Sequence, residues 1–177
     1  MSDNKKLDLY IKRVRVVLIV LFIIWLLVIF GFSQQDGESS SKLSMKIANF
    51  IFKNENVAKS MEGAIRKVAH MLEYAWGGGL VAAYFMTYSP DFWKRNIKAT
   101  FIITIIAILD EVHQHFIPGR NGVWYDVLID VGGCILGIFI FHSICFMTNV
   151  VDFIATTKVN KNDDDEEANI KNPYKYN

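Results

Sequence analysis

The chain has 177 residues, of which 52% are apolar, and a formal net charge of +1. Its length allows a single domain. Its basic residues gather at the ends of apolar runs and form no continuous stripe, which argues against a nucleic-acid-binding protein. The apolar residues occur in long blocks, and this distribution, more than the overall composition, indicates an integral membrane protein.

The first apolar block runs from Val16 to Phe32 without a charged residue. It approaches the roughly 20 residues that an α-helix needs to cross the hydrocarbon core. The core of a cleaved signal peptide is usually shorter and ends in small residues, whereas this block carries Trp25 and Phe30 near its end. We therefore expect a retained transmembrane helix, preceded by a basic cytoplasmic N-terminus over residues 1–15.

A polar, serine-rich stretch follows, and then apolar residues recur at helical spacing between Leu43 and Met61. This pattern predicts an amphipathic helix with Ser40 or Ser41 as its N-cap. Lysines on its polar side favour a position on an anionic membrane surface. A small soluble helix that caps the bundle fits the same pattern. The lysines are Lys42, Lys46, Lys53 and Lys59.

Three further spans are expected over residues 68–89, 98–116 and 123–148, with Pro90 and Pro118 in the turns. Their acidic residues would be costly against lipid, so these helices should pack together and turn them inward. Gly77 to Gly79 and the Gly133-x-x-x-Gly137 spacing permit a close helix approach. The predicted fold is all-α, an integral membrane bundle of four transmembrane helices plus an amphipathic surface helix between helices one and two.

The charge distribution predicts a multi-pass protein of the cell membrane with both termini in the cytoplasm. Basic residues precede the first span, and Lys94, Arg95 and Lys98 crowd the second short loop. The basic residues of the 33–67 connection count against this orientation. We expect residues 16–148 to form the membrane domain and residues 149–177, with their acidic run, to be a disordered cytoplasmic tail. Cys134 and Cys145 lie too far apart on one helix for a disulfide.

With this orientation, eight polar residues of the last three spans fall in the outer third of the membrane. They are Arg66, His70, Glu73, Asp110, His113, Gln114, Asp126 and Asp130. Within each helix, spacings of three, four or seven positions place them on one face. Glu111 and His115 form a second pair, rotated away from Asp110, which we expect to face water at the helix end.

Ionisable groups inside a membrane are costly and mark functional sites by default. The candidate ligand-binding residues are Arg66, Lys67, Gln114 and Arg120. The candidate acid and base residues are His70, Glu73, Asp110, His113, Asp126 and Asp130. The candidate metal ligands among them are His70, Glu73, His113 and Asp126. No cofactor is assigned.

At these residues the chain resembles the VanZ-like family of bacterial membrane proteins, which is named for a component of teicoplanin resistance clusters. The resemblance covers roughly residues 10 to 145. It implies a cell-envelope protein associated with lowered susceptibility to lipoglycopeptide antibiotics, and it implies no reaction. Family members often carry Asn where Asp130 stands. The motifs are Phe32-Ser33-Gln34-Gln35, Arg66-Lys67-x-x-His70-x-x-Glu73-Tyr74, Asp110-Glu111-x-His113-Gln114, Pro118-Gly119-Arg120 and Asp126-x-x-x-Asp130-x-x-Gly133.

Four functions fit the polar residues. The favoured hypothesis is a binding protein whose partners are membrane lipids and an anionic envelope precursor or glycolipid. The alternative is an intramembrane enzyme, a metal-assisted or acid-base hydrolase or transferase acting on an envelope lipid. A proton-coupled carrier would use Glu73 and Asp130. A purely structural network of ion pairs would hold the helices in register.

Overall fold

The computed structural model describes residues 3–148 with the exception of residue 121, and every regular element in this part is an α-helix. This confirms the all-α fold class. The part of the chain outside these ranges includes the predicted tail over residues 149–177. The helices are α1 (Asp3–Ser33), α2 (Gly37–Phe52), α3 (Glu55–Met86), α4 (Phe92–His115) and α5 (Trp124–Met147).

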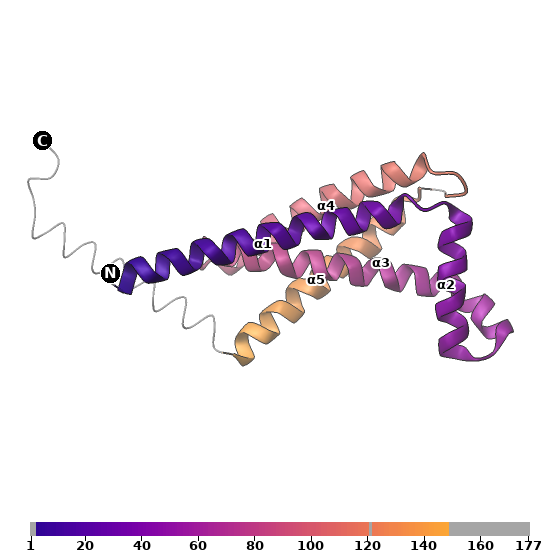
Figure 1. Ribbon diagram of the computed structural model, residues 1–177, viewed down its shortest axis with the longest axis horizontal. Coiled ribbons are helices and arrows are strands. Elements are labelled where there is room, and N and C mark those ends of the chain that lie inside the picture. Colours follow the sequence, from indigo (N-terminus) through magenta and orange to yellow (C-terminus); the bar gives the residue numbers. More distant parts are fainter. Residues whose placement is uncertain (1–2, 121, 149–177) are drawn as a thin grey trace, which may run out of the picture.

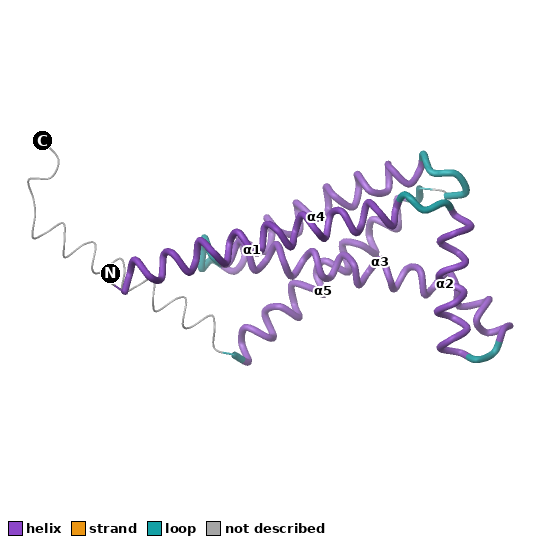
Figure 2. The backbone as a smooth tube through the Cα atoms, in the orientation of Figure 1, coloured by secondary structure: helices purple, strands orange, loops and turns teal. Residues whose placement is uncertain are grey.

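The long helices α1, α3 and α4 lie alongside one another, and α5 crosses them obliquely (Figure 1). Consecutive long helices run in opposite directions, so the loops gather at two ends of the bundle (Figure 2). Helix α2 lies across one of these ends, beside the loop that joins α4 to α5. We call this end the α2 end and the other, at the α3–α4 turn, the far end.

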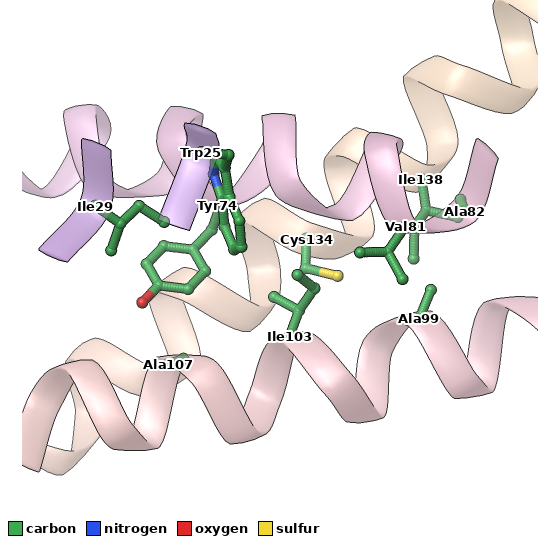
Figure 3. Close-up of a cluster of buried hydrophobic side chains, with 10 residues drawn as sticks. All are labelled: Trp25, Ile29, Tyr74, Val81, Ala82, Ala99, Ile103, Ala107, Cys134 and Ile138. Atoms are coloured by element: carbon green, nitrogen blue, oxygen red, sulfur yellow. The ribbon is translucent and has the colours of Figure 1, made fainter. Parts of the chain in front are cut away.

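The apolar core lies between α1, α3, α4 and α5 (Figure 3). Trp25 of α1 is buried and donates a hydrogen bond from its indole Nε1 to the carbonyl oxygen of Glu73 at 2.8 Å. Its ring meets Tyr74 edge to face, with centroids 5.9 Å apart. Ala99, Ile103 and Ala107 recur on one face of α4 and pack into this core. The core therefore fixes α3 and α4 against α1 directly beneath the polar α2 end.

Helices α3 and α5 approach closely through three glycines, which we call the glycine interface: Gly78, Gly133 and Gly137. A Cβ atom on Gly137 would overlap the backbone carbonyl of Ala75, and one on Gly133 would overlap that of Met71. Small residues of this kind allow two helix backbones to touch. The close approach expected from the glycine spacing is confirmed.

Two described helices are long and apolar enough to cross a membrane, α1 over Lys5–Ser33 and α5 over Trp124–Met147. The expected four spans are therefore not all recognised by length and hydropathy, and the number of spans stays a prediction. Two of the predicted spans are parts of longer helices, since α1 begins at Asp3 and α3 at Glu55. Cys134 and Cys145 are buried free thiols, as their spacing predicted.

The helix expected between the first two spans is present as α2, but its predicted extent from Leu43 to Met61 is wrong. The chain turns at Lys53, whose φ of 50° is left-handed, and Asn54 begins the next helix. The Asn54 side chain accepts hydrogen bonds from the backbone N–H groups of Asn56 and Val57. The predicted serine cap is also wrong, because Asp36 caps α2 by accepting from the Ser39 N–H group. Side-chain caps at both positions satisfy amides that a continuous helix would not leave free.

Candidate functional site

A cavity of about 290 Å³ opens at the α2 end, between α3, α4, α5 and the loop before α5. Charged and polar side chains from four separate segments line it. A glycine and a few apolar residues complete the lining. The lining residues are Arg66, Lys67, His70, Glu111, Gln114, Gly119, Arg120, Val123, Tyr125, Asp126, Ile129 and Asp130. The four candidate ligand-binding residues are all among them.

Three cationic side chains line the cavity. The Lys67 ammonium lies 3.9 Å from Asp126 Oδ1 and 4.8 Å from the centre of the Tyr125 ring. Arg66 reaches only Glu62 of its own helix, at 4.0 Å. Arg120 donates from Nη2 to the carbonyl oxygen of Phe32 at 3.4 Å. Burial lowers the pKa of Arg120 from its ordinary value, but a guanidinium stays charged at neutral pH.

Three carboxylates line the same cavity from α4 and α5. Glu111 is buried and accepts a hydrogen bond from the backbone N–H of Val123, which precedes the first turn of α5. Asp126 and Asp130 follow one and two turns further along α5 and lie on one face. Asp130 is only 2% exposed. Its Oδ1 atom, like Oδ1 of Asp126, has no hydrogen-bond partner among the described residues.

A buried hydrogen-bond network adjoins the cavity and joins α1, α3 and α4. Asp110 is fully buried, and its Oδ2 accepts from the Tyr74 hydroxyl at 3.3 Å and from Gln114 Nε2 at 2.9 Å. Gln114 Nε2 also donates to the Ser33 hydroxyl at 3.2 Å. Asp110 therefore does not line the cavity but holds Gln114, which does.

The two histidines of the candidate set lie in different surroundings. His70 lines the cavity, and its Nδ1 is 4.0 Å from Oε2 of Glu73, which does not line it. His113 lies outside the cavity, against α1, where its ring meets Phe30 edge to face and Nε2 is 3.5 Å from Gln34 Nε2. Within the described ranges, no group of three or more His, Cys, Asp or Glu side chains is arranged to hold a metal ion.

The rotation of α4 differs from the expectation. Asp110 and Gln114 face inward as predicted, but Glu111 joins them in place of His113, and the expectation that Glu111 faces water is wrong. His115 is exposed, as predicted. Glu111, Tyr74 and Ser33 were not among the predicted site residues. All three belong to the family motifs given above, and this membership could have identified them as site residues.

The first residue of α2 is fastened to the loop before α5. The Gly37 N–H donates to the Pro118 carbonyl at 3.1 Å, and a Cβ atom on Gly37 would overlap the Gly119 carbonyl. Gly119 itself has a φ of +73°, a conformation that favours glycine. Arg120, which lines the cavity, follows Gly119 directly and donates a hydrogen bond to the carbonyl oxygen of Phe32. The loop before α5 is therefore held against both α1 and α2.

The far end carries a second cavity, of about 450 Å³. Its charged lining residues are all cationic, and they stand among aromatic rings. Its lining residues are Tyr84, Phe85, Tyr88, Ser89, Lys94, Arg95 and Lys98. Beside it, Arg15 of α1 donates to the hydroxyl and the carbonyl oxygen of Thr87 at 2.9 and 2.8 Å and lies 3.7 Å from the centre of the Tyr88 ring.

Comparison with known families gives one match. The family model described as VanZ/LLP1 matches residues 18–147, which include every described residue that lines the two cavities. No curated protein and no solved structure matches the chain. Most of the chain, including all of α5 and the second half of α1, thus falls within one family pattern. The chain belongs to the VanZ/LLP1 family and is a VanZ-like membrane protein.

Proposed function

We propose that this protein crosses the cell membrane with α1, α3, α4 and α5 and binds an anionic group of a cell-envelope component in the cavity at the α2 end. The observation that carries the proposal is the gathering of Arg66, Lys67 and Arg120 around one cavity of about 290 Å³. Two guanidinium groups and an ammonium are the side chains best suited to a phosphate or carboxylate.

The outer surface of the bundle supports the membrane topology. Ile97 and Phe101 of α4 and Leu72 and Trp76 of α3 are exposed, although neither helix is apolar throughout. Exposed apolar side chains on every long helix suit a surface that faces lipid. The antiparallel arrangement of these helices also returns both ends of the described chain to the far end (Figure 1).

The basic residues support an orientation with the cavity on the outer side. Lys5, Lys6, Lys12, Arg13 and Arg15 all belong to the start of α1. Lys94, Arg95 and Lys98 belong to the start of α4, which lies at the same far end. Because cytoplasmic segments are enriched in Lys and Arg, the far end is the cytoplasmic one in this proposal. The cavity then opens in the outer leaflet, where an envelope lipid would present its headgroup.

Such binding would change what the cell surface presents to a lipid-tailed glycopeptide such as teicoplanin. The volume of the cavity is close to the lower limit of small-molecule sites, about 300 Å³. It suits a headgroup better than a whole lipid. Tyr125 lines the cavity and Trp124 is exposed beside it, as expected for aromatic residues at a membrane interface.

The binding test uses the full chain in detergent and short-chain dihexanoyl phosphatidic acid, followed by isothermal titration calorimetry. The double variant Arg66→Gln with Lys67→Gln should weaken binding about a hundredfold or more, since each of the two charge-assisted hydrogen bonds contributes roughly 1.5–3 kcal/mol. The matched control is Lys42→Gln, an exposed lysine at the same end that pairs with Glu38 and lies outside the cavity. Equal affinity of wild type and double variant would refute the proposal.

An enzyme acting on an envelope lipid is the second candidate, and one observation favours it. His70 lines the cavity, and its Nδ1 lies 4.0 Å from Oε2 of Glu73, a separation that one intervening water would bridge for proton transfer. Incubation of the full chain with dihexanoyl phosphatidylethanolamine, followed by mass spectrometry of the lipid, tests this candidate. Headgroup release that is lost in His70→Gln would support an enzyme, and an unchanged lipid would count against it.

A further inference from the structure

The cavity at the α2 end contains a carboxylate that the proposed anionic ligand does not explain. Asp130 is 2% exposed, lines the cavity, and has an Oδ1 atom without a hydrogen-bond partner among the described residues. A buried polar atom without a partner costs free energy, and a buried charge costs more. An anion bound at Arg66, Lys67 and Arg120 would leave this atom as it is.

The neighbours of Asp130 increase the demand for a positive charge. Two other carboxylates, Glu111 and Asp126, line the same cavity, and Asp126 lies one turn away on α5. Lys67, a cation of the same cavity, pairs with Asp126, its Nζ 3.9 Å from Asp126 Oδ1. Glu111 is occupied by the N–H group of Val123. Asp130 is therefore the carboxylate of the cavity left for a ligand.

The cavity is thus lined by two charge types from different segments. Its cations come from α3 and from the loop before α5, and its carboxylates come from α4 and α5. A simple anion site would not need three carboxylates in its wall. Volume also limits the ligand, because about 290 Å³ accommodates a small headgroup in which both charges are close together.

We propose that the ligand is a zwitterion, an aminoalkyl phosphate such as the phosphoethanolamine headgroup, whose phosphate lies at Arg66, Lys67 and Arg120 and whose ammonium lies at Asp130. This inference rests on the proposed binding function and specifies its ligand. The Asp130 Oδ1 atom accepts a hydrogen bond from the ammonium, and Asp126, one turn away on α5, adds a second negative charge. Three phosphate oxygens match the several donors of the cationic side better than a carboxylate does.

The test measures the affinity of the full chain in detergent for three lipid probes that differ only at the nitrogen. Dihexanoyl phosphatidylethanolamine carries the ammonium, its N-methyl derivative keeps the charge, and its N-acetyl derivative lacks it. In wild type, N-acetylation should weaken binding about tenfold, the effect of one charge-assisted hydrogen bond, and N-methylation should change it little. If N-acetylation leaves the affinity unchanged or increases it, the inference is wrong.

Asp130→Asn should remove this preference, so that the N-acetyl and parent probes bind the variant equally. The experiment is a double-mutant cycle in which the probe nitrogen and residue 130 are varied in turn. Binding of the probes elsewhere on the protein therefore cancels. Glu38→Gln is the control, because Glu38 is a carboxylate at the same end that pairs with Lys42 and does not line the cavity. It should keep the tenfold preference. A preference that survives in Asp130→Asn, or disappears equally in Glu38→Gln, would contradict a site at Asp130.

The wild-type measurement needs no variant, so the test holds even if Asp130→Asn does not fold. The same measurements distinguish failure of the zwitterion inference from failure of the proposed binding function. If all three probes bind equally and Arg66→Gln weakens all of them, the anion site stands and the zwitterion does not. If none of the probes binds, the proposed function itself fails. Free O-phosphoethanolamine as competitor distinguishes a soluble ligand, which displaces the lipid probe, from a lipid held also by its acyl chains.

Discussion

The two ends of the bundle use buried charge in different ways. At the far end, Arg15 donates to both oxygens of Thr87 and stacks on Tyr88. His142 and Asn96 are also hydrogen-bonded to each other there, Nε2 to Oδ1 at 3.0 Å. At the α2 end, Asp126 and Asp130 each have an oxygen atom beside a cavity that accepts no hydrogen bond from the described residues, although that of Asp126 lies 3.9 Å from the Lys67 ammonium. Arg15 at the far end thus fastens helices together, although the far end also holds Arg95, which is buried and whose Nε has no hydrogen-bond partner among the described residues. The unpartnered carboxylate oxygens belong to the cavity at the α2 end.

This difference separates stability from function along one molecule. A charge whose hydrogen bonds are satisfied within the fold contributes to the free energy of unfolding. A buried carboxylate without a partner lowers it, and such groups are retained where they bind something. The cavities agree with this division, because the cavity at the α2 end combines both signs and the one at the far end is cationic only.

Loss of the glycine interface should have the largest effect, because it removes the packing that both ends share. Gly137→Ala places a methyl group on the Ala75 carbonyl and should destabilise the protein by about 1–3 kcal/mol or more. Thermal unfolding in detergent measures this loss. Gly132→Ala is the control, since a Cβ atom there meets no atom within 4 Å. Equal melting temperatures for the two variants would contradict a close α3–α5 contact.

Arg15→Gln should affect stability and leave ligand binding intact. It removes the charged hydrogen bonds to Thr87 and should lower the free energy of unfolding by about 1–3 kcal/mol. Phosphatidic acid titration should give an unchanged affinity for the cavity at the α2 end. Arg13→Gln, an exposed position on the same helix, should change neither quantity. An Arg15→Gln variant that loses cavity binding at full stability would end the separation of the two ends.

Asp126→Asn should lower teicoplanin tolerance several-fold in a bacterial host that expresses the protein, because Asp126 lines the cavity and pairs with Lys67. Glu73→Gln and His113→Ala should lower it less, since neither residue lines the cavity. The minimal inhibitory concentration measures tolerance, with membrane levels of each variant checked by immunoblot. If all three variants retain tolerance and fold normally, the cavity has no part in resistance.

The smallest effect is expected at Asp36, which belongs to the α2 end but lies outside the cavity. Hydrogen bonds from the backbone and hydroxyl of Ser39 lower the pKa of Asp36. Its stabilisation of α2 is therefore complete above the ordinary aspartate pKa and is lost as pH falls through the lowered folded value. Asp36→Ala should lower the melting temperature slightly at neutral pH. This difference should vanish in acid, and a difference that persists there would exclude the carboxylate as its cause.

The sequence was sufficient for much of the candidate site because its motifs carry strong chemical constraints. Arg66, Lys67, Gln114 and Arg120 were selected as ligand-binding residues, and all four line one cavity. Lipid-compatible helices have few places for such groups, so polar residues in separate helices are forced towards one another. The helix-forming blocks and the glycine spacing were equally clear, because both follow from short-range periodicity.

The rotation of α4 about its axis, by contrast, could not be predicted from the sequence. Asp110, Glu111, His113 and Gln114 occupy consecutive or nearly consecutive positions, so a shift of one residue in packing decides which of them faces inward. Tyr74 and Ser33, far away in the chain, fix that choice by contacting Asp110 and Gln114.

The break between α2 and α3 was missed for a different reason. The apolar spacing continues through Lys53 and Asn54, and the local capping chemistry of Asn54 overrides it.

The contact between Gly37 and the Pro118-Gly119 turn has a consequence for biosynthesis. The end of α1 and the start of α2 find their partners, Gln114, Pro118 and Arg120, some 80 residues later in the chain. The end of α1 and the start of α2 therefore cannot complete these contacts until α4 and the loop before α5 have been synthesised. The α2 end is completed late during synthesis, and the ligand cavity exists only once the ribosome has delivered nearly the whole family domain.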